Sequence, residues 1–200
     1  MHLLYPRPQL NPGSPWFPMS DVTRLLEEAR SGDAQAWDRA VALVYDDLKR
    51  VARGVLGGPG GGTLNATGLV HECYLRLARA GPDGVVNRSH FLALAARAMR
   101  QLMLNHARDR LAQKRGGGAA HCDIDEHSER LADEAGQLLE LDSALARLQS
   151  ENPDWVRVVE CRVFAGLTEQ ETADALDLPL RSSQRLWADA RARLGELLAS

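Results

Sequence analysis

Apolar residues that recur every three or four positions are the feature that most restricts how this chain can fold. Two runs show the spacing clearly: Trp37, Val41, Val44, Leu48 and Val51, and then Phe91, Ala95, Met99, Leu102 and His106. This period places apolar side chains on one face of an α-helix, whereas a half-buried strand needs strict alternation. Because no stretch of the sequence alternates in that way, we predict an all-α fold.

Two stretches poor in apolar residues divide the helical pattern. Residues 54–62, GVLGGPGGG, are rich in glycine and indicate a flexible break. Residues 116–136, GGGAAHCDIDEHSERLADEAG, are polar and acidic and indicate a flexible linker. The sequence therefore predicts two small helical domains, over 19–115 and 137–200, joined by that linker.

The first 18 residues, MHLLYPRPQLNPGSPWFP, differ in composition from the rest of the chain. Prolines occur at five of these positions, out of nine in the whole sequence. The stretch lacks the charged and then apolar layout of a signal peptide, so we predict a disordered leader over 1–18. Met19 is then a possible start of translation, and Ser20 is a possible cap for the first helix.

The cysteines and the hydropathy together indicate a cellular compartment. Cys73, Cys122 and Cys161 are three in number and scattered, which favours a reducing environment over a disulfide framework. No apolar run approaches the ~18 residues that a membrane-spanning helix needs. We therefore expect a cytoplasmic protein that has no membrane partner.

The net charge of −3 conceals two blocks of opposite charge. Residues 87–118 contain one acidic residue, Asp109, and seven basic ones: Arg88, Arg97, Arg100, Arg108, Arg110, Lys114 and Arg115. Residues 121–142 contain one basic residue, Arg130, and eight acidic ones: Asp123, Asp125, Glu126, Glu129, Asp133, Glu134, Glu140 and Asp142. The basic block indicates either a polyanion partner or a solvated helix face. We hypothesise that the acidic block folds over the basic one and masks it.

Near the carboxyl end, the sequence predicts two short helices joined by a tight turn. Thr168 and Glu171 form a capping box, which predicts a helix from there to about Leu176. The DLP sequence at 177–179 ends that helix, because proline cannot continue a helix but can open the next one. On the second helix one face is apolar: Leu186, Trp187, Ala190, Leu194 and Leu197. The opposite face carries Arg181, Gln184, Arg185 and Ala188. The pattern fits a DNA-binding helix-turn-helix or a generic helical hairpin.

Three blocks in order resemble a known protein family. They are TLNATGLVHECYLRLARA, NRSHFLALAARAMRQLMLNHARDRLAQKRGGG and GLTEQETADALDLP. Over roughly residues 20–198 their order and spacing are similar to the extracytoplasmic-function (ECF) sigma factors of bacterial RNA polymerase. The resemblance implies sigma domain two over 19–115, which binds the β′ coiled coil of core polymerase and melts the minus-ten element. It also implies sigma domain four over 137–200, which reads the minus-thirty-five element of promoter DNA.

The same resemblance assigns roles to individual residues. Gln101 and Asn105 stand where the family places polar residues that read an extruded base of the minus-ten element. The implied phosphate contacts are Arg97, Arg100, Arg108, Arg110, Lys114 and Arg115. His106 is a candidate base contact, although its place on the apolar face also fits packing. The implied readers of the minus-thirty-five element are Arg181, Ser182, Gln184 and Arg185.

The polymerase-binding helix departs from the family pattern. Ordinary members carry several acidic residues there, whereas this chain has only Glu72, and Asn65–Gly68 stand where negative charge is expected. Phosphorylation of Thr67 in the first turn would supply nearly two negative charges, and the helix dipole favours them there. We therefore predict that Thr67, with Thr63 as second choice, is a target of a serine/threonine protein kinase. The alternative is that Thr67 only caps or packs.

Other chemistry is not predicted. His71, Glu72 and Cys73 are adjacent and point in different directions on a helix, and His121, Cys122 and His127 offer only three ligands, so we expect no metal. No nucleophile with a base, phosphate-binding loop or carboxylate pair is recognisable, so we expect no cofactor and no enzyme. The alternatives to a sigma factor are a stand-alone helix-turn-helix regulator with an amino-terminal partner-binding domain and, third, a purely structural interaction protein.

Overall fold

The computed structural model describes residues 21–56, 65–82, 84–116 and 126–199. All the secondary structure in these ranges is helical, which confirms the all-α prediction. The elements are α1 (Asp21–Arg30), α2 (Ala34–Leu43), α3 (Tyr45–Val55), α4 (Ala66–Ala80), α5 (Arg88–Gly116), α6 (Glu126–Glu151), α7 (Pro153–Val159), the π-helical segment η1 (Glu160–Phe164), α8 (Glu169–Leu176) and α9 (Leu180–Ala199). The predicted leader, with Met19 and Ser20, lies outside the described ranges.

The first apolar run belongs to two helices rather than one. Asp33 caps α2 by accepting hydrogen bonds from the backbone N–H groups of the first turn. Val44 then separates α2 from α3, with φ −103° and ψ 9°. Trp37, Val44 and Leu48 are nevertheless all buried. The apolar period is therefore continuous across a break that periodicity alone does not reveal.

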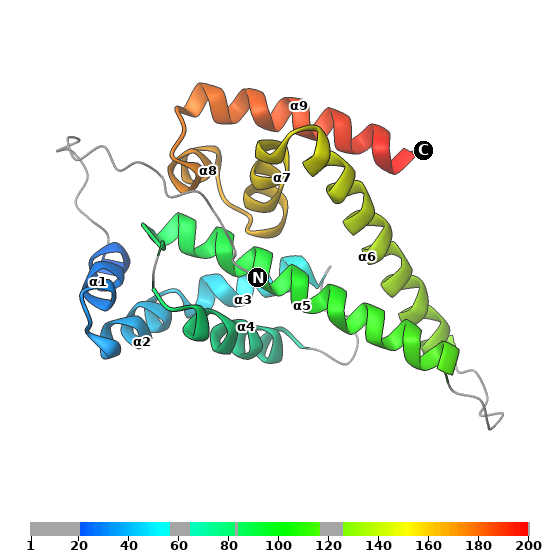
Figure 1. Cartoon of the computed structure of the whole chain (residues 1–200), viewed down its shortest axis with the longest axis horizontal. Coiled ribbons are helices and arrows are strands. Elements are labelled where there is room, and N and C mark those ends of the chain that lie inside the picture. The colour runs from blue at the N-terminus through cyan, green and yellow to red at the C-terminus, as the bar shows by residue number, and fades with distance from the viewer. Residues whose placement is uncertain (1–20, 57–64, 83, 117–125, 200) are drawn as a thin grey trace.

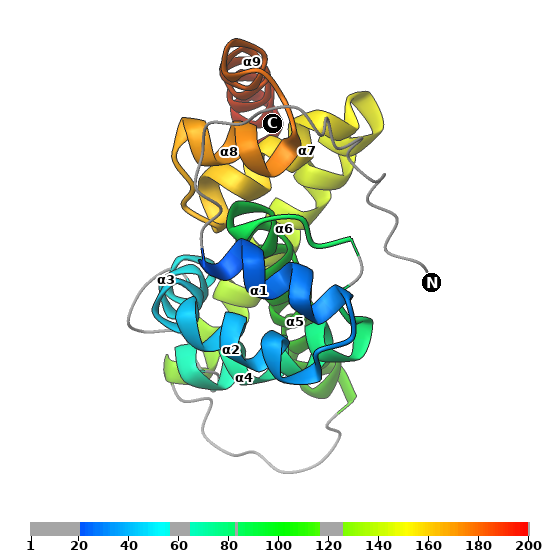
Figure 2. The same ribbon diagram turned by 90° about the vertical axis from the view of Figure 1, so that its left-hand side faces the viewer.

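α5 is the central element of the fold. It packs against α3 and α4 and also against α6, η1 and α8. Figure 1 shows α5 running between a layer that contains α1–α4 and a layer that contains α7–α9, and Figure 2 shows the same two layers from the side. Because α5 has neighbours on several sides, residues all around its first half are buried, including Leu92, Ala93 and Ala96.

One apolar core joins the two halves of the chain. The cluster of buried residues includes Leu26 and Leu69 from the first half and Leu148 and Val158 from the second. All four side chains are nearly or fully inaccessible to solvent. The two predicted domains are therefore in contact through apolar burial, which is the main favourable term in such packing.

α6 begins inside the stretch that the sequence predicted as a linker. The helix spans Glu126–Glu151, so residues 126–136 are helical, which corrects the expectation of a flexible linker there. An acidic composition does not exclude a helix, because Glu, Leu and Ala are all strong helix formers. Packing of α6 against α5 adds tertiary stabilisation. Residues 117–125 of the predicted linker lie outside the described ranges.

Candidate nucleic-acid and polymerase interface

α5 carries the basic block, and Asn87 determines where this helix begins. The side-chain Oδ1 of Asn87 accepts a hydrogen bond from the backbone N–H of His90 at 2.8 Å, as an N-cap residue does. The helix then continues for 29 residues to Gly116. At 1.5 Å per residue, its length is on the order of 40 Å, long enough to distribute the basic side chains along a single strand of nucleic acid.

Arg100 lies at the contact between the two halves of the chain. Its Nη1 donates to Asp142 of α6 at 2.8 Å, and its Nη2 donates to Glu160 of η1 at 3.0 Å. The Arg100 side chain is 11% exposed and that of Glu160 is 3% exposed. The guanidinium carbon also lies 5.8 Å from the centre of the Phe164 ring. Sequence reasoning assigned Arg100 to phosphate contact, but in this structure its side chain is committed to protein carboxylates.

The other predicted minus-ten residues differ in exposure. Arg108 is 50% exposed and donates to Asp142 at 3.0 Å. Gln101 Nε2 donates to Asn105 Oδ1 at 3.3 Å, so the two predicted base readers are neighbours on one face. Asn105 is exposed, whereas Gln101 and Arg97 are partly buried. The side chains of Arg110, Lys114 and Arg115 lie outside the described residues.

His106 meets the predicted polymerase-binding helix. Its Nε2 lies 3.2 Å from Glu72 Oε2 of α4, and both side chains are about 40% exposed, at 41% and 39% respectively. The contact joins two residues that sequence reasoning had placed in separate sites. His106 therefore packs against α4 and keeps part of its ring exposed to solvent.

The helix-turn-helix forms as the local signals predict. Thr168 Oγ1 accepts from the backbone N–H of Glu171, and the Glu171 carboxylate accepts from the backbone N–H of Thr168, which completes the capping box. Asp177 ends α8 in the left-handed conformation at φ 54°. Asp and Asn are among the few residues besides Gly that adopt this conformation readily.

The predicted readers of the minus-thirty-five element lie at the start of α9. Arg181, Gln184 and Arg185 are exposed, and Ser182 is partly exposed. Gln184 Nε2 donates to Glu169 Oε2 of α8 at 2.6 Å, which fixes one reader relative to the preceding helix.

The opposite face of α9 is apolar and packs inward, as predicted. Ala190 and Leu197 are buried, and Leu186, Trp187 and Leu194 pack against the core. The Arg162 guanidinium lies 5.8 Å from the centre of the Trp187 ring.

The first helix of the helix-turn-helix is tied to α5. Arg88 donates to Glu171 of α8 at 3.1 Å and also pairs with Asp47 of α3. Asn87 Nδ2 donates to the backbone carbonyl of Asp174 at 3.2 Å. Asn87 and Arg88 lie more than 80 residues before the groups of α8 that they contact, so no local sequence signal predicts these contacts.

Thr67 lies in the first turn of α4, on an exposed part of the surface. Asn65 caps this helix by accepting a hydrogen bond from the backbone N–H of Gly68 at 2.8 Å. The cap is therefore Asn65, and the first turn contains no acidic residue. Thr67 is exposed, and the other predicted phosphorylation site, Thr63, lies outside the described residues.

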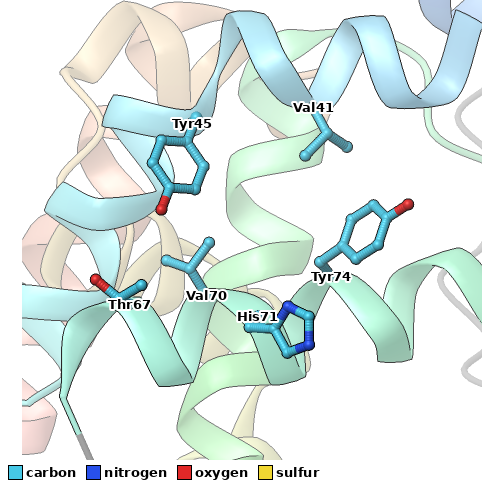
Figure 3. A pocket seen from close by; sticks show the side chains of 6 residues that line it. All are labelled: Val41, Tyr45, Thr67, Val70, His71 and Tyr74. Atoms are coloured by element: carbon cyan, nitrogen blue, oxygen red, sulfur yellow. The ribbon is translucent and has the colours of Figure 1, made fainter.

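A small pocket of about 150 Å³ adjoins Thr67. Its lining comes from α2, α3 and α4: Val41, Tyr45, Thr67, Val70, His71 and Tyr74 (Figure 3). Thr67 and Tyr45 lie at one end of the pocket, and Val41 and Tyr74 lie at the other. The pocket is thus largely apolar, and Thr67 contributes an aliphatic hydroxyl to its lining.

Asp38 is a carboxylate beside this pocket that sequence reasoning missed. Tyr74 donates its hydroxyl to Asp38 Oδ1 at 2.7 Å, and this hydrogen bond raises the pKa of Tyr74. Asp38 is exposed on α2. Because Asp38 and Tyr74 are 36 residues apart, only the tertiary structure reveals the pair.

Two cysteines are buried as free thiols, Cys73 and Cys161. Burial raises the pKa of each thiol to about 12, which makes both poor nucleophiles. Among the described residues, no group of three or more His, Cys, Asp or Glu is placed to hold a metal ion. Within the same part of the chain, no helix is both long and apolar enough to cross a bilayer.

A long helix that carries the basic block is followed by a helix-turn-helix in an all-α fold, an arrangement that is typical of DNA-binding proteins. The sequence profile of the family described as ECF sigma factor matches residues 19–200. The chain therefore belongs to the ECF sigma factor family. The match includes the first half as well as the helix-turn-helix, which a stand-alone regulator with an unrelated amino-terminal domain would not give.

Comparison with individual proteins gives one solved structure to report. A solved structure of CnrH in complex with the cytosolic domain of CnrY has 21% sequence identity to this chain and a TM-score of 0.41. The alignment covers 90% of this chain and 97% of that one. No curated protein matches the sequence. ECF sigma factors bind RNA polymerase and promoter DNA, and the family consists of transcription factors rather than enzymes.

Proposed function

We propose that this sigma factor directs core RNA polymerase to specific promoters after phosphorylation of Thr67. In this proposal α5 captures the melted minus-ten strand through Gln101, Asn105 and the basic side chains of the helix. The start of α9 reads the minus-thirty-five element through Arg181, Ser182, Gln184 and Arg185. The α4 surface around Thr67 and Glu72 binds the β′ coiled coil of polymerase, in the cytoplasm where polymerase and promoters meet.

The observation that carries the regulatory part is the position of Thr67. Its side chain is exposed in an α4 first turn without acidic residues, at the edge of a largely apolar pocket. A phosphate there would add about −1.5 to −2 charges and three acceptor oxygens. Basic side chains of a partner can pair with these oxygens, and the helix N-terminus stabilises the added charge.

The proposed modification is an ordinary phosphoryl transfer. A serine/threonine protein kinase would transfer the γ-phosphoryl group of ATP to Thr67 Oγ1. The hydroxyl loses its proton, the bond to the β-phosphate breaks, and ADP leaves. The exposure of Thr67 supports access to its hydroxyl.

Binding to purified core polymerase tests the role of Thr67. We expect the chain carrying phosphothreonine at position 67 to bind core polymerase at least about tenfold more tightly than the unmodified chain, since one to three charge-assisted hydrogen bonds are gained. Phosphatase treatment of the same sample is the matched control and should abolish the gain.

Transcription in cells gives a second test of the same proposal, through variants at position 67. Thr67→Ala should lose activity, whereas Thr67→Ser, which keeps a hydroxyl acceptor, should retain it. Equal polymerase affinity with and without the phosphate, together with full activity of Thr67→Ala, would refute the phosphorylation switch.

A further inference from the structure

Asp142 of α6 binds two of the arginines that are proposed to contact DNA. Its Oδ1 accepts from Arg100 at 2.8 Å, and its Oδ2 accepts from Arg108 at 3.0 Å. One carboxylate therefore bridges two cations that are eight residues, or about two turns, apart on α5. A DNA phosphate offers the same geometry, because it is also an anion with two unesterified oxygens.

Glu160 adds a second carboxylate to the same contact. It accepts from the remaining terminal nitrogen of Arg100 at 3.0 Å and is almost fully buried. Glu160 lies in the π-helical segment η1, which packs against α5. Arg100 thus has a carboxylate on each of its two terminal nitrogens and cannot reach a phosphate without leaving both.

The contact is supported by packing on both sides of the ion pairs. α6 and η1 both pack against α5. Leu104 and Ala107 of α5 are buried, and so is Leu145 of α6, three residues after Asp142. Figure 1 shows α6 leaving the end of α5 and crossing to the layer that contains α7 and α9. Separation of α6 and η1 from α5 therefore requires the loss of apolar contact as well as of ion pairs.

We propose that α6 and η1 form an autoinhibitory latch, in which Asp142 and Glu160 compete with DNA phosphates for Arg100 and Arg108. The latch rests on the proposed function only in taking DNA as the ligand of α5. The latch is narrower than the masking that the sequence predicts. The acidic residues that pair with the arginines of α5 are Asp142, which belongs to the acidic block, and Glu160, which is buried and lies outside that block. The exposed carboxylates of Asp133, Glu134 and Glu140 are not among these ion pairs.

Competition of this kind predicts two measurable effects. If only a fraction of the chain has the latch open, the apparent dissociation constant for DNA is raised by the inverse of that fraction. Opening also frees two cations, and each cation that neutralises a phosphate of single-stranded DNA steepens the log–log dependence of affinity on salt by about 0.7. The freed arginines should therefore change both the affinity and its salt slope.

The test compares Asp142→Asn with Glu151→Gln in the full chain. Both substitutions remove one negative charge from α6, but Glu151 pairs with Arg193 of α9 rather than with α5. Binding of a fluorescent single-stranded DNA oligonucleotide of mixed sequence is measured by anisotropy over a range of salt. We expect Asp142→Asn to bind about tenfold more tightly than Glu151→Gln, equivalent to about 1.4 kcal/mol. Its salt slope should be steeper by about 0.7, the contribution of Arg108, because Arg100 keeps its pair with Glu160 in this variant.

Equal affinity and equal slope for the two variants would overturn the latch. Hydrogen exchange on the parent chain gives a second test that does not depend on any variant. Addition of the same oligonucleotide should increase amide exchange in α6 and η1, because these elements must leave α5. Unchanged or slower exchange in α6 and η1 on DNA binding would also overturn the latch.

Failure of the latch and failure of the proposed function have different signatures. The oligonucleotide measurements involve no polymerase and no kinase, so they report only on competition for α5. A chain that shows the latch but never binds core polymerase would contradict the proposed function alone. A chain that binds core polymerase when phosphorylated, but whose two variants bind DNA equally, would contradict the latch alone.

Discussion

Replacement of Glu160 by Gln should destabilise the protein by more than its single lost charge suggests. The carboxylate is 3% exposed and accepts from Arg100, which is 11% exposed. Removal of one partner of a buried pair costs about 3–5 kcal/mol when the other charge is left uncompensated. Here Arg100 keeps its pair with Asp142, and the amide oxygen of Gln can still accept a hydrogen bond. We therefore expect a loss of about 2–3 kcal/mol in the free energy of unfolding.

Thermal denaturation followed by circular dichroism measures this loss. For a chain of this size, about 1 kcal/mol corresponds to about 2–4 °C, so the melting temperature of Glu160→Gln should fall by about 4–12 °C. Glu151→Gln is the matched control, because its surface pair with Arg193 is screened by solvent and should matter little. The double variant Arg100→Met with Glu160→Gln should be no less stable than Arg100→Met alone. The reason is that Arg100→Met keeps the buried negative charge of Glu160, whereas the double variant removes it. Equal melting temperatures for Glu160→Gln and Glu151→Gln would refute the buried pair.

Two further predictions concern the cap of α8 and a buried histidine. Thr168→Ala removes the capping box of α8 and should lower the free energy of unfolding by about 1 kcal/mol. Thr168→Ser keeps the hydroxyl and should restore this stability. If denaturant titration shows no loss for Thr168→Ala, the role of the cap is contradicted. Burial, with a smaller contribution from the charge of Arg157, lowers the pKa of His90 from 6.5 to about 4. Between these two values the unfolded chain binds more protons, so stability should fall as the pH is lowered through this window, by at most about 1.4 kcal/mol per pH unit. His90→Gln should reduce that slope, and parallel stability curves for the two proteins would show the assignment to be wrong.

Local signals in the sequence predict the helix-turn-helix well. The Thr168 and Glu171 capping box, the turn at 177–179 and the inward face of α9 depend on residues within a few positions of one another. Hydrogen bonds and apolar periods at such short range are encoded in the order of the residues. The all-α fold follows from the same periodicity. The break between α2 and α3 at Val44 cannot be predicted from this periodicity, because the apolar period continues through it.

Contacts between the halves could not be predicted in this way. Arg100 meets Asp142 and Glu160, which are 42 and 60 residues away, and composition only indicated opposite charges. The helical start of α6 was missed because its acidic composition was interpreted as a linker. Arg88 with Glu171, and Tyr74 with Asp38, likewise depend on tertiary packing. Sequence therefore identified the basic helix, but only the structure shows which of its arginines are already engaged by protein.

Transcription of genomic DNA fragments from the source bacterium by purified core polymerase tests the central claim most directly. The transcripts are sequenced from reactions without the protein, with the unmodified chain and with the chain carrying phosphothreonine at position 67. We expect new 5′ ends, preceded by a shared pair of upstream motifs, when the modified chain is present. If neither form of the chain gives new 5′ ends, the account of this protein as a promoter-opening sigma factor is contradicted.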